Sequence, residues 1–579
     1  MAFSVMVSML VSFTLTPMLC SRLLKRIADK RGEGSGPQAP EHSSKDSRFF
    51  RWLDRIYGSI LEWSLKHRGI TALVALATFA LTFPLNALVG RDFIPTDDQS
   101  ELTVNVEAPI GTSLDATARV ESSMAREIEH LPGVEFVNPS ISSQSNEGRM
   151  YVRLQDLSKR KLSNTDIASA MRKTLAEYKE VDTRVFFPSA LGNSSFFGGI
   201  RVLIVGPDFY QVAEIAKQVG ARMRSLAGLK DIYVDANLNK PELQVKLDRQ
   251  RASDLGVEVA DVANAVRLLM AGTDQISTYK EGSEQYDVTM QLLPEQQRNP
   301  EVLSRLMVPS SKVGQVRLDN IASIQRGFGP RVLDRYNRQF RVNVSANNTP
   351  EFPLDVAVKA IREEIGKVGL PPGYTYRFTG TVKQLDETTA NLIAAFLLAS
   401  IFMYMVLAAQ FDSFLHPFVI MLSLPLSIPF ALLTLYLTHR TLNLWSALGV
   451  FLLLGIVKKN GILQVDYTNR LRNQGVPLRE AIVQANHVRL RPILMTTFSI
   501  VAGLIPTAIG IGAGAAQRSA IAVTIIGGQM LCLLLTLIVT PVAYSLFAGL
   551  EEKGVAAQVH AGLARLRLGV ARVFTMHVR

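Results

Sequence analysis

Apolar residues are gathered into seven long uncharged runs that alternate with polar stretches along the chain. The runs cover residues 3–20, 69–90, 392–411, 418–437, 442–457, 492–517 and 521–550. A helix needs about 20 apolar residues to cross the hydrocarbon core of a bilayer, and several runs reach that length. We therefore predict seven transmembrane helices: one within residues 1–20, one within 69–90 and five within 388–550.

A different pattern fills residues 91–385, where short strand-like runs alternate with amphipathic stretches of helical period. The order β-α-β-β-α-β predicts a ferredoxin-like (split βαβ) unit over residues 91–190. The pattern recurs in a second unit, formed by residues 191–239 and 332–385, and residues 240–331 interrupt it. The predicted fold is a polytopic α-helical membrane protein with a large α/β region of two ferredoxin-like modules and an inserted subdomain.

The formal charge of +12 follows the same division. Lys and Arg number eleven in residues 21–68, five in residues 466–491 and five in residues 551–579. These zones lie on one side of the membrane if the helices alternate in direction, and the positive-inside rule places that side in the cytoplasm. We therefore expect a cytoplasmic linker at 21–68, a cytoplasmic tail at 551–579 and an outward-facing α/β region. Membrane topology accounts for the basic excess, so no nucleic-acid partner is expected.

Cysteine and histidine usage argues against several kinds of site. The two cysteines, Cys20 and Cys532, both lie in apolar runs, so the α/β region must fold without disulfides. No Cys/His spacing typical of zinc is present, and the eight histidines are scattered. Neither a Gly-x-Ser-x-Gly nor a His-Glu-x-x-His motif occurs. We expect neither an enzyme nor a cofactor or metal site.

Lys458 and Lys459 stand inside an otherwise apolar helix. A lysine near the middle of a bilayer costs about 2.5–3.5 kcal/mol on insertion scales. The side chain either reaches the cytoplasmic interface or serves as a functional charge beside a polar partner, and the spacing does not decide which lysine faces inward. The next apolar run follows Arg489 and contains Thr496 and Thr497. These hydroxyls either bond back to their own helix or face the lysines.

Two pairs of aromatic residues flank a turn rich in Pro, Gly and Ser in the α/β region. They are Phe186 with Phe187, and Phe196 with Phe197. Aromatic residues near a strand end commonly belong to the core. The alternative is an apolar lining for a cleft that accepts hydrophobic substrates.

Six segments of the chain together resemble one family. They are residues 13–22 (FTLTPMLCSR), 93–98 (FIPTDD), 410–417 (QFDSFLHP), 459–463 (KNGIL), 489–496 (RLRPILMT) and 512–515 (GAGA). In this order they resemble the C-terminal half of a resistance–nodulation–division (RND) efflux transporter of the hydrophobe/amphiphile type, the AcrB-like multidrug pumps. The resemblance runs nearly from end to end.

The resemblance implies a proton antiporter of the Gram-negative inner (cell) membrane that exports hydrophobic or amphiphilic compounds. Such pumps are usually homotrimers joined to a periplasmic adaptor (a membrane fusion protein) and an outer-membrane channel. Their relay lysine pairs with two aspartates of the fourth helix, and its position here is Lys459, followed by Asn460 in the same motif. Thr496 and Arg489 are expected to complete the relay.

The resemblance also implies roles for the periplasmic α/β region. The two modules would be porter subdomains with a substrate cleft between them, and residues 240–331 would be a docking subdomain. Phe186 and Phe187 lie where phenylalanines of the cleft are expected. The loop at residues 140–148 departs from the pattern, because it is short and has no phenylalanine where drug pumps often carry an aromatic switch loop.

A second departure concerns the proton relay. The sequence has no counterpart of the fourth helix and its aspartates, and Asp466 lies on the same helix as Lys459 at the membrane edge. We expect the second half of a pump, as a fragment of a longer reading frame or with a separate first half. The alternatives are a half-protein that aids protein translocation, as in the SecD/SecF pair, and a transport-dead membrane scaffold. A metal exporter is disfavoured, because the methionines of the α/β region show no close pairing in sequence.

Overall fold

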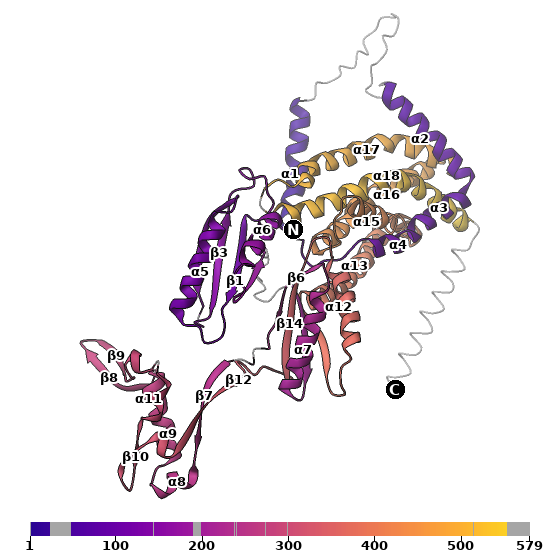
Figure 1. The fold of residues 1–579 in the computed structure, drawn as a ribbon. Helices are drawn as coiled ribbons and strands as arrows, with labels where there is room; N and C mark the ends of the chain where they lie inside the picture. Colours follow the sequence, from indigo (N-terminus) through magenta and orange to yellow (C-terminus); the bar gives the residue numbers. More distant parts are fainter. Residues whose placement is uncertain are drawn as a thin grey trace, which may run out of the picture. The chain divides into compact units, whose positions relative to one another are not determined.

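The computed structural model describes most of the chain (Figure 1). The described residues are 2–23, 48–95, 97–142, 144–188, 199–236, 238, 240–272, 274–297, 299–512 and 514–552. The chain divides into two compact units, Met1–Tyr57 and Gly58–Arg579. The first unit holds α1 (Ala2–Leu23) and the start of α2 (Arg48–Lys66), which continues into the second unit.

Helix α2 lies within residues 21–68, where the sequence predicts a cytoplasmic linker. Its sequence, RFFRWLDRIYGSILEWSLK, repeats apolar residues with helical period and places charged residues between them. Such an amphipathic pattern favours a helix that rests one face on an apolar surface. Tyr57, Leu61 and Leu65 are accordingly buried. The described part of residues 21–68 is therefore mostly helical.

The apolar runs of the second unit form helices of unequal length. Their bounds are α3 (Arg68–Ala80), α4 (Thr82–Leu88), α13 (Thr381–Phe411), α14 (Leu415–Met421), α15 (Ile428–Leu437), α16 (Leu444–Asn473), α17 (Leu478–Ile509) and α18 (Ala515–Glu552). Among the described residues, five helical segments are long and apolar enough to cross a membrane: Arg68–Leu88, Thr381–Phe411, Leu444–Asn473, Leu478–Ile509 and Ala515–Ala548. The total of seven spans stays a prediction.

The expected span at residues 418–437 is interrupted in the structure. Helix α14 ends at Met421, and α15 begins only at Ile428. Pro425 lies in the intervening turn, and Pro429 lies in the first turn of α15. Proline lacks a backbone N–H and is tolerated at the start of a helix but not in its interior. The other short apolar helical segment is Met6–Arg22.

The first α/β module is one antiparallel sheet with two helices. Its elements are β1 (Glu101–Glu107), α5 (Leu114–Glu129), β2 (Val134–Ile141), β3 (Glu147–Leu154), α6 (Asn164–Leu175) and β4 (Asp182–Phe186). The strand order is β2-β3-β1-β4. Val104 pairs with Met150 on one side and Val185 on the other, and all three are buried beneath apolar residues of α5 and α6. The β-α-β-β-α-β order expected from the sequence is present.

The second module repeats this strand order with a long interruption. Its elements are β5 (Ile200–Gly206), α7 (Phe209–Arg224), β6 (Leu229–Val234), β13 (Arg335–Tyr336), β14 (Gln339–Asn348), α12 (Leu354–Val368) and β15 (Thr375–Gly380). Strand β14 pairs with β5 and β6, and β5 also pairs with β15. Apolar residues of α7 and α12 complete its core.

The interruption forms a separate small unit at the end of a two-stranded ribbon (Figure 1). Strands β7 (Lys240–Leu247) and β12 (Ala322–Gly329) pair from Lys240 opposite Gly329 to Leu247 opposite Ala322. Between them lie α8 (Arg249–Asp254), α9 (Val259–Val266), η2 (Arg267–Ala271), β8 (Gln275–Glu281), β9 (Glu284–Thr289), α10 (Pro294–Gln297), α11 (Pro300–Ser304), β10 (Met307–Ser310), β11 (Gly314–Arg317) and η3 (Leu318–Asn320). This unit has its own small apolar core.

Candidate functional site

The two adjacent lysines of α16 have opposite environments. Lys458 is 2% exposed, and its Nζ donates to the carbonyl oxygen of Ile420 at 3.0 Å and contacts Ser423 Oγ at 3.5 Å. Lys459 is exposed. The structure therefore uses Lys458 to join α16 to the α14 region and turns Lys459 away from the packed helices.

Lys459 lies on an exposed stripe of α16. Leu452, Gly455 and Lys459 follow one another at spacings of three and four residues, and all three are exposed. Residues at these spacings share one face of an α-helix. Asn460, the other expected relay residue of this helix, is buried on a neighbouring face. Only Lys459 of the pair Lys459–Asn460 is thus presented on the open face.

Helix α17 places the expected threonine and arginine at different depths. The half-buried Thr496 donates its hydroxyl to the carbonyl oxygen of Ile493 at 3.1 Å, so it bonds back to its own helix. Thr497 is fully buried and accepts a hydrogen bond from Gln529 Nε2 of α18 at 3.3 Å. The guanidinium of Arg489 lies 4.8 Å from the centre of the Tyr467 ring.

The Arg489–Tyr467 contact fixes the alignment of the two antiparallel helices. Lys459 is eight residues from Tyr467 on α16, and Thr496 is seven residues from Arg489 on α17. At 1.5 Å per residue, both lie roughly 10–12 Å beyond that contact, in the same direction. The structure therefore brings Lys459 and Thr496 to one level of neighbouring helices, and Arg489 lies about two turns closer to the connecting loop.

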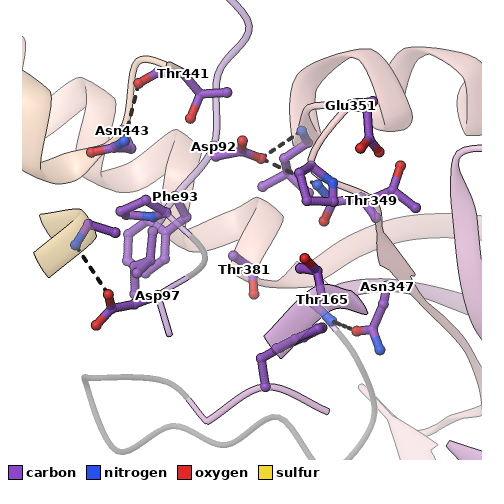
Figure 2. A pocket seen from close by; sticks show the side chains of 18 of the residues that line it. Asp92, Phe93, Asp97, Thr165, Asn347, Thr349, Glu351, Thr381, Thr441 and Asn443 are labelled. Carbon is purple, nitrogen blue, oxygen red and sulfur yellow. Dashed lines mark hydrogen bonds between the residues drawn. The ribbon is translucent and has the colours of Figure 1, made fainter. Parts of the chain in front are cut away.

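A cavity of about 960 Å³ lies between the two α/β modules and the adjacent ends of membrane helices (Figure 2). The first module contributes Thr165, Arg172, Phe186 and Phe187, the second contributes Lys230, Asn347 and Glu351, and the helix ends and their connections contribute Asp92, Asp97, Thr381, Arg440 and Asn443. The lining mixes charges of both signs with apolar groups. It is therefore less apolar than the aromatic residues of the sequence suggest.

The expected cleft phenylalanines divide between core and cavity. Phe186 is largely buried, and the partly buried Phe187 packs against the core of the first module, yet both reach the cavity. Phe196 and Phe197 lie outside the described residues. Phe93 is a further aromatic lining residue (Figure 2). In the sequence, Phe93 stands out only as part of the segment FIPTDD.

Buried charges join the two modules on another side. Arg184 Nη2 donates to Glu107 Oε2 at 2.7 Å, and its guanidinium carbon lies 3.8 Å from the centre of the Tyr233 ring in the second module. Burial raises the pKa of Glu107 above its ordinary value, although the nearby Arg184 and Arg331 partly offset this effect. Arg331, just beyond β12, forms an ion pair with Glu147 of the first module. The cluster therefore involves both modules and the segment that leads from the inserted unit back into the second module.

The pairing of Arg172 with Asp231 is a further contact that spacing alone did not reveal. Arg172 on α6 donates Nε to Asp231 Oδ1 at 3.1 Å and Nη2 to Oδ2 at 2.7 Å. A bidentate arginine–carboxylate pair of this kind restrains orientation as well as distance. Its members are 59 residues apart in sequence, so no local pattern reports it.

The chain matches the model of the AcrB/AcrD/AcrF family over residues 1–548. The chain belongs to this family of RND efflux transporters. The AcrB/AcrD/AcrF assignment agrees with the resemblance of the six sequence segments, and the matched relatives are transporters rather than enzymes. Among the described residues, no group of three or more His, Cys, Asp or Glu is arranged to hold a metal ion.

Relatives of the family cover this chain almost completely. Multidrug resistance protein MdtC of Yersinia pestis bv. Antiqua (strain Angola) is 28% identical over 554 residues, which are 94% of this chain and 53% of the relative. MdtC of Yersinia pseudotuberculosis serotype O:3 (strain YPIII) gives the same values. The chain thus spans about half the length of these relatives. Their family, together with the apolar helices, fits a multi-pass inner-membrane protein.

Solved structures confirm the fold at lower identity. A crystal structure of a heavy metal efflux pump (crystal form II) has a TM-score of 0.77 and 23% identity, covering 86% of this chain and 52% of the pump. Crystal form I gives a TM-score of 0.75 and 24% identity over the same shares. At this identity the likeness concerns the arrangement of elements and carries no information on the substrate.

Proposed function

We propose that this chain is the second half of a proton-driven RND pump that exports hydrophobic or amphiphilic compounds. The observation that carries the proposal is the open face of α16 and α17, where Lys459 is exposed at the level of Thr496. An ammonium group in this setting requires a counter-charge or water, because its transfer into lipid is unfavourable. A helix with carboxylates, supplied by the half that the chain does not cover in its relatives, would meet that requirement.

Proton coupling follows from such a pairing. Carboxylates beside Lys459 attract its ammonium while they are ionised and release it when they bind protons. Because the ammonium lies in a region of low dielectric, this change alters the interaction between the two halves far more than it would in water. The resulting movement of α16 would drive the cycle, with Thr496 at the level of Lys459, Arg489 about two turns away along α17 and Asn460 next to Lys459 in the chain.

The cavity between the modules is the proposed passage for substrates. Its volume of about 960 Å³ is within the range of small-molecule sites. Phe93, Phe186 and Phe187 offer apolar contacts, while the charged lining residues suit the polar ends of amphiphilic compounds. We accordingly propose that the two modules are porter subdomains and that their relative movement opens and closes this cavity.

The inserted unit is the proposed docking subdomain. Its β8–β9 hairpin exposes four large apolar side chains: Ile276, Tyr279, Tyr286 and Val288. A long exposed apolar hairpin is a hazard for a free protein and is typical of an interface. We propose a homotrimer in which a second copy of the chain covers this hairpin, with a periplasmic adaptor and an outer-membrane channel as further partners.

The relay is tested by a pair of neighbouring substitutions. Lys459→Ala should reduce the energy-dependent extrusion of an amphiphilic fluorescent dye to background in bacteria that produce the protein from its own gene. The matched control is Lys458→Met, which keeps most of the apolar stem of the buried side chain, removes its ammonium and should leave extrusion nearly unchanged. Immunoblotting of membranes checks that both variants accumulate equally. Normal extrusion by Lys459→Ala would refute the relay, and inactivity of the parent protein would favour the scaffold alternative.

A further inference from the structure

Four helices begin against one short segment that follows α4, of which residues 90–95 and 97–98 are described. Asp92 Oδ1 accepts a hydrogen bond from the backbone N–H of Leu354, the first residue of α12, at 2.9 Å. The carbonyl oxygen of Phe93 accepts one from the N–H of Leu444, the first residue of α16, at 3.1 Å. Two helices of different parts of the protein thus share adjacent acceptors.

Asp97 and Asp98, at the end of the segment, accept hydrogen bonds from the starts of the other two helices. Asp97 Oδ1 accepts from the N–H of Ala516 in the first turn of α18 at 3.2 Å. Asp98 Oδ2 accepts from the N–H of Asn164, the first residue of α6, at 2.9 Å. The contacts of Asp92 and Asp97 are visible at the edge of the cavity (Figure 2).

These bonds use the donors that helices leave unsatisfied. The first N–H groups of an α-helix have no partner within the helix, and the helix dipole favours negative charge at that end. Three aspartates and one carbonyl therefore hold four helix starts by the same physical interaction. Asp97 is only 7% exposed, which keeps its contact with α18 away from solvent.

Additional bonds limit movement within the segment. Arg91 and Asp355 are joined twice: the N–H of Arg91 donates to Asp355 Oδ1 at 3.0 Å, and the N–H of Asp355 donates to the Arg91 carbonyl at 3.2 Å. Asn164 Nδ2 donates to the Asp97 carbonyl at 3.1 Å, and Arg160 forms an ion pair with Asp98. At Gly90, an added Cβ would collide with Pro353 ahead of α12.

The four helices connect the proposed relay with both modules. Helix α16 carries Lys459, and α18 packs against α15, α16 and α17. Helix α6 belongs to the first module and α12 to the second. A shift of α16 or α18 along its axis would therefore pull on a segment that is bonded to both modules.

We propose that the described residues 92–95 and 97–98 form a coupling segment that transmits shifts of α16 and α18 to both α/β modules, with Asp97 and Asp98 as positioning residues. This inference rests on the proposed function, since it concerns how transport movements are transmitted. The segment acts as one unit because Asp92, Asp97, Asp98 and the Phe93 carbonyl each accept a hydrogen bond from a different helix start.

Hydrogen–deuterium exchange of the purified protein tests the unit directly. Asp97→Ala removes the acceptor for the first turn of α18. If the segment moves as one unit, the rate of amide exchange should rise by about threefold or more in all four peptides that contain a helix start, those with Ala516, Leu444, Leu354 and Asn164. Asp97→Asn retains an acceptor oxygen and should restore most of the protection. Asp115→Asn, an exposed aspartate in the first turn of α5, is the matched control and should change none of these peptides. A rise confined to the peptide of Ala516 would overturn the inference.

Dye extrusion separates this inference from the proposed function. Asp98→Ala should slow extrusion several-fold while equilibrium binding of the dye to purified protein stays within about twofold, because Asp98 is not among the described residues that line the cavity and positioning affects movement rather than affinity. An equal loss of binding and extrusion would place Asp98 in the substrate site and overturn the coupling role, as would unchanged extrusion. If the parent protein extrudes no dye, the proposed function fails, and the exchange experiment still decides whether the four helix starts move as one unit.

Discussion

At the scale of single residues, burial distinguishes side chains that the sequence presents as equivalent. Lys458 and Lys459 are adjacent, yet one bonds to the carbonyl of Ile420 inside the helix bundle and the other is exposed. Acidic residues of one helix differ in the same way. On α5, Glu129 is exposed, whereas Glu121 is 1% exposed, and its carboxylate oxygen Oε1 has no hydrogen-bond partner among the described residues.

Glu121 gives a prediction for the pH dependence of stability. Burial raises its pKa above the ordinary value, although the N–H of Ser140 partly offsets this effect. Between the ordinary and the raised pKa, the folded state binds a proton that the unfolded state releases. The free energy of unfolding therefore decreases as the pH rises through this window and is larger on its acidic side.

The substitution Glu121→Gln should remove this slope and raise the thermal midpoint at neutral pH, because an amide keeps the shape without the buried charge. The pH dependence of stability is measured by thermal unfolding of the purified protein in detergent between pH 4 and 8. Glu129→Gln, an exposed glutamate of the same helix, serves as control. Identical pH profiles for Glu121→Gln and the parent protein would contradict the prediction.

At the scale of elements, small residues determine how closely the membrane helices pack. Gly527 and Gly528 of α18 lie directly against Thr434 of α15 and Leu453 of α16, where an added Cβ would overlap both neighbours. Small residues at such positions allow helix backbones to approach within a membrane. Gly503 of α17, in contrast, has open space where a Cβ would be placed.

The contrast between these glycines predicts opposite tolerances to a methyl group. Gly527→Ala should destabilise the protein by about 1–3 kcal/mol, the usual cost of overpacking a close contact. Gly503→Ala should be neutral, since its Cβ meets no atom and alanine favours the helix. Thermal unfolding in one detergent compares the two variants. Equal stability of both would show that α15 and α18 do not pack as closely as described.

At the scale of the whole molecule, charged contacts tie the modules together around the cavity. The Arg172–Asp231 pair lies at the cavity, and the Glu107–Arg184 pair meets Tyr233 elsewhere between the modules. Removing one member of a buried ion pair leaves the other charge buried without a partner, which lowers the stability of the folded state. Specific charged contacts thus join the two modules.

The proposed homotrimer supplies a prediction at the same scale. Tyr279 of β8 stands opposite Tyr286 of β9, and the two are 56% and 52% exposed. The double substitution Tyr279→Asp and Tyr286→Asp should shift the protein from trimer to monomer, because charge in an apolar interface is unfavourable. Native mass spectrometry measures this shift. The exposed Val313→Asp, on the same inserted unit, is the control, and a trimer that persists in the double variant would refute this interface.

Much of the fold was predictable because its determinants are local. The apolar runs, the β-α-β-β-α-β order and the interruption of the second module follow from periodicities of a few residues. Pro425 and Pro429 mark the break between α14 and α15, but the length of the apolar run by itself predicts one continuous helix. The residues that precede α2 are rich in Gly, Pro and charge, so the sequence pattern of the region favours a linker although it contains this helix.

Only part of the candidate site was predictable. The sequence by itself determined that a lysine pair lies in a membrane helix and that hydroxyls and an arginine follow on the next one. The tertiary structure decided that Lys459 rather than Lys458 is exposed, that Thr496 shares its level and that Phe186 is mainly a core residue. It also decided that Asp92, Phe93, Asp97 and Asp98 meet the starts of four helices. The physical reason is distance along the chain: Asp97 and Ala516 are 419 residues apart, and only the packed fold brings such groups within hydrogen-bond range.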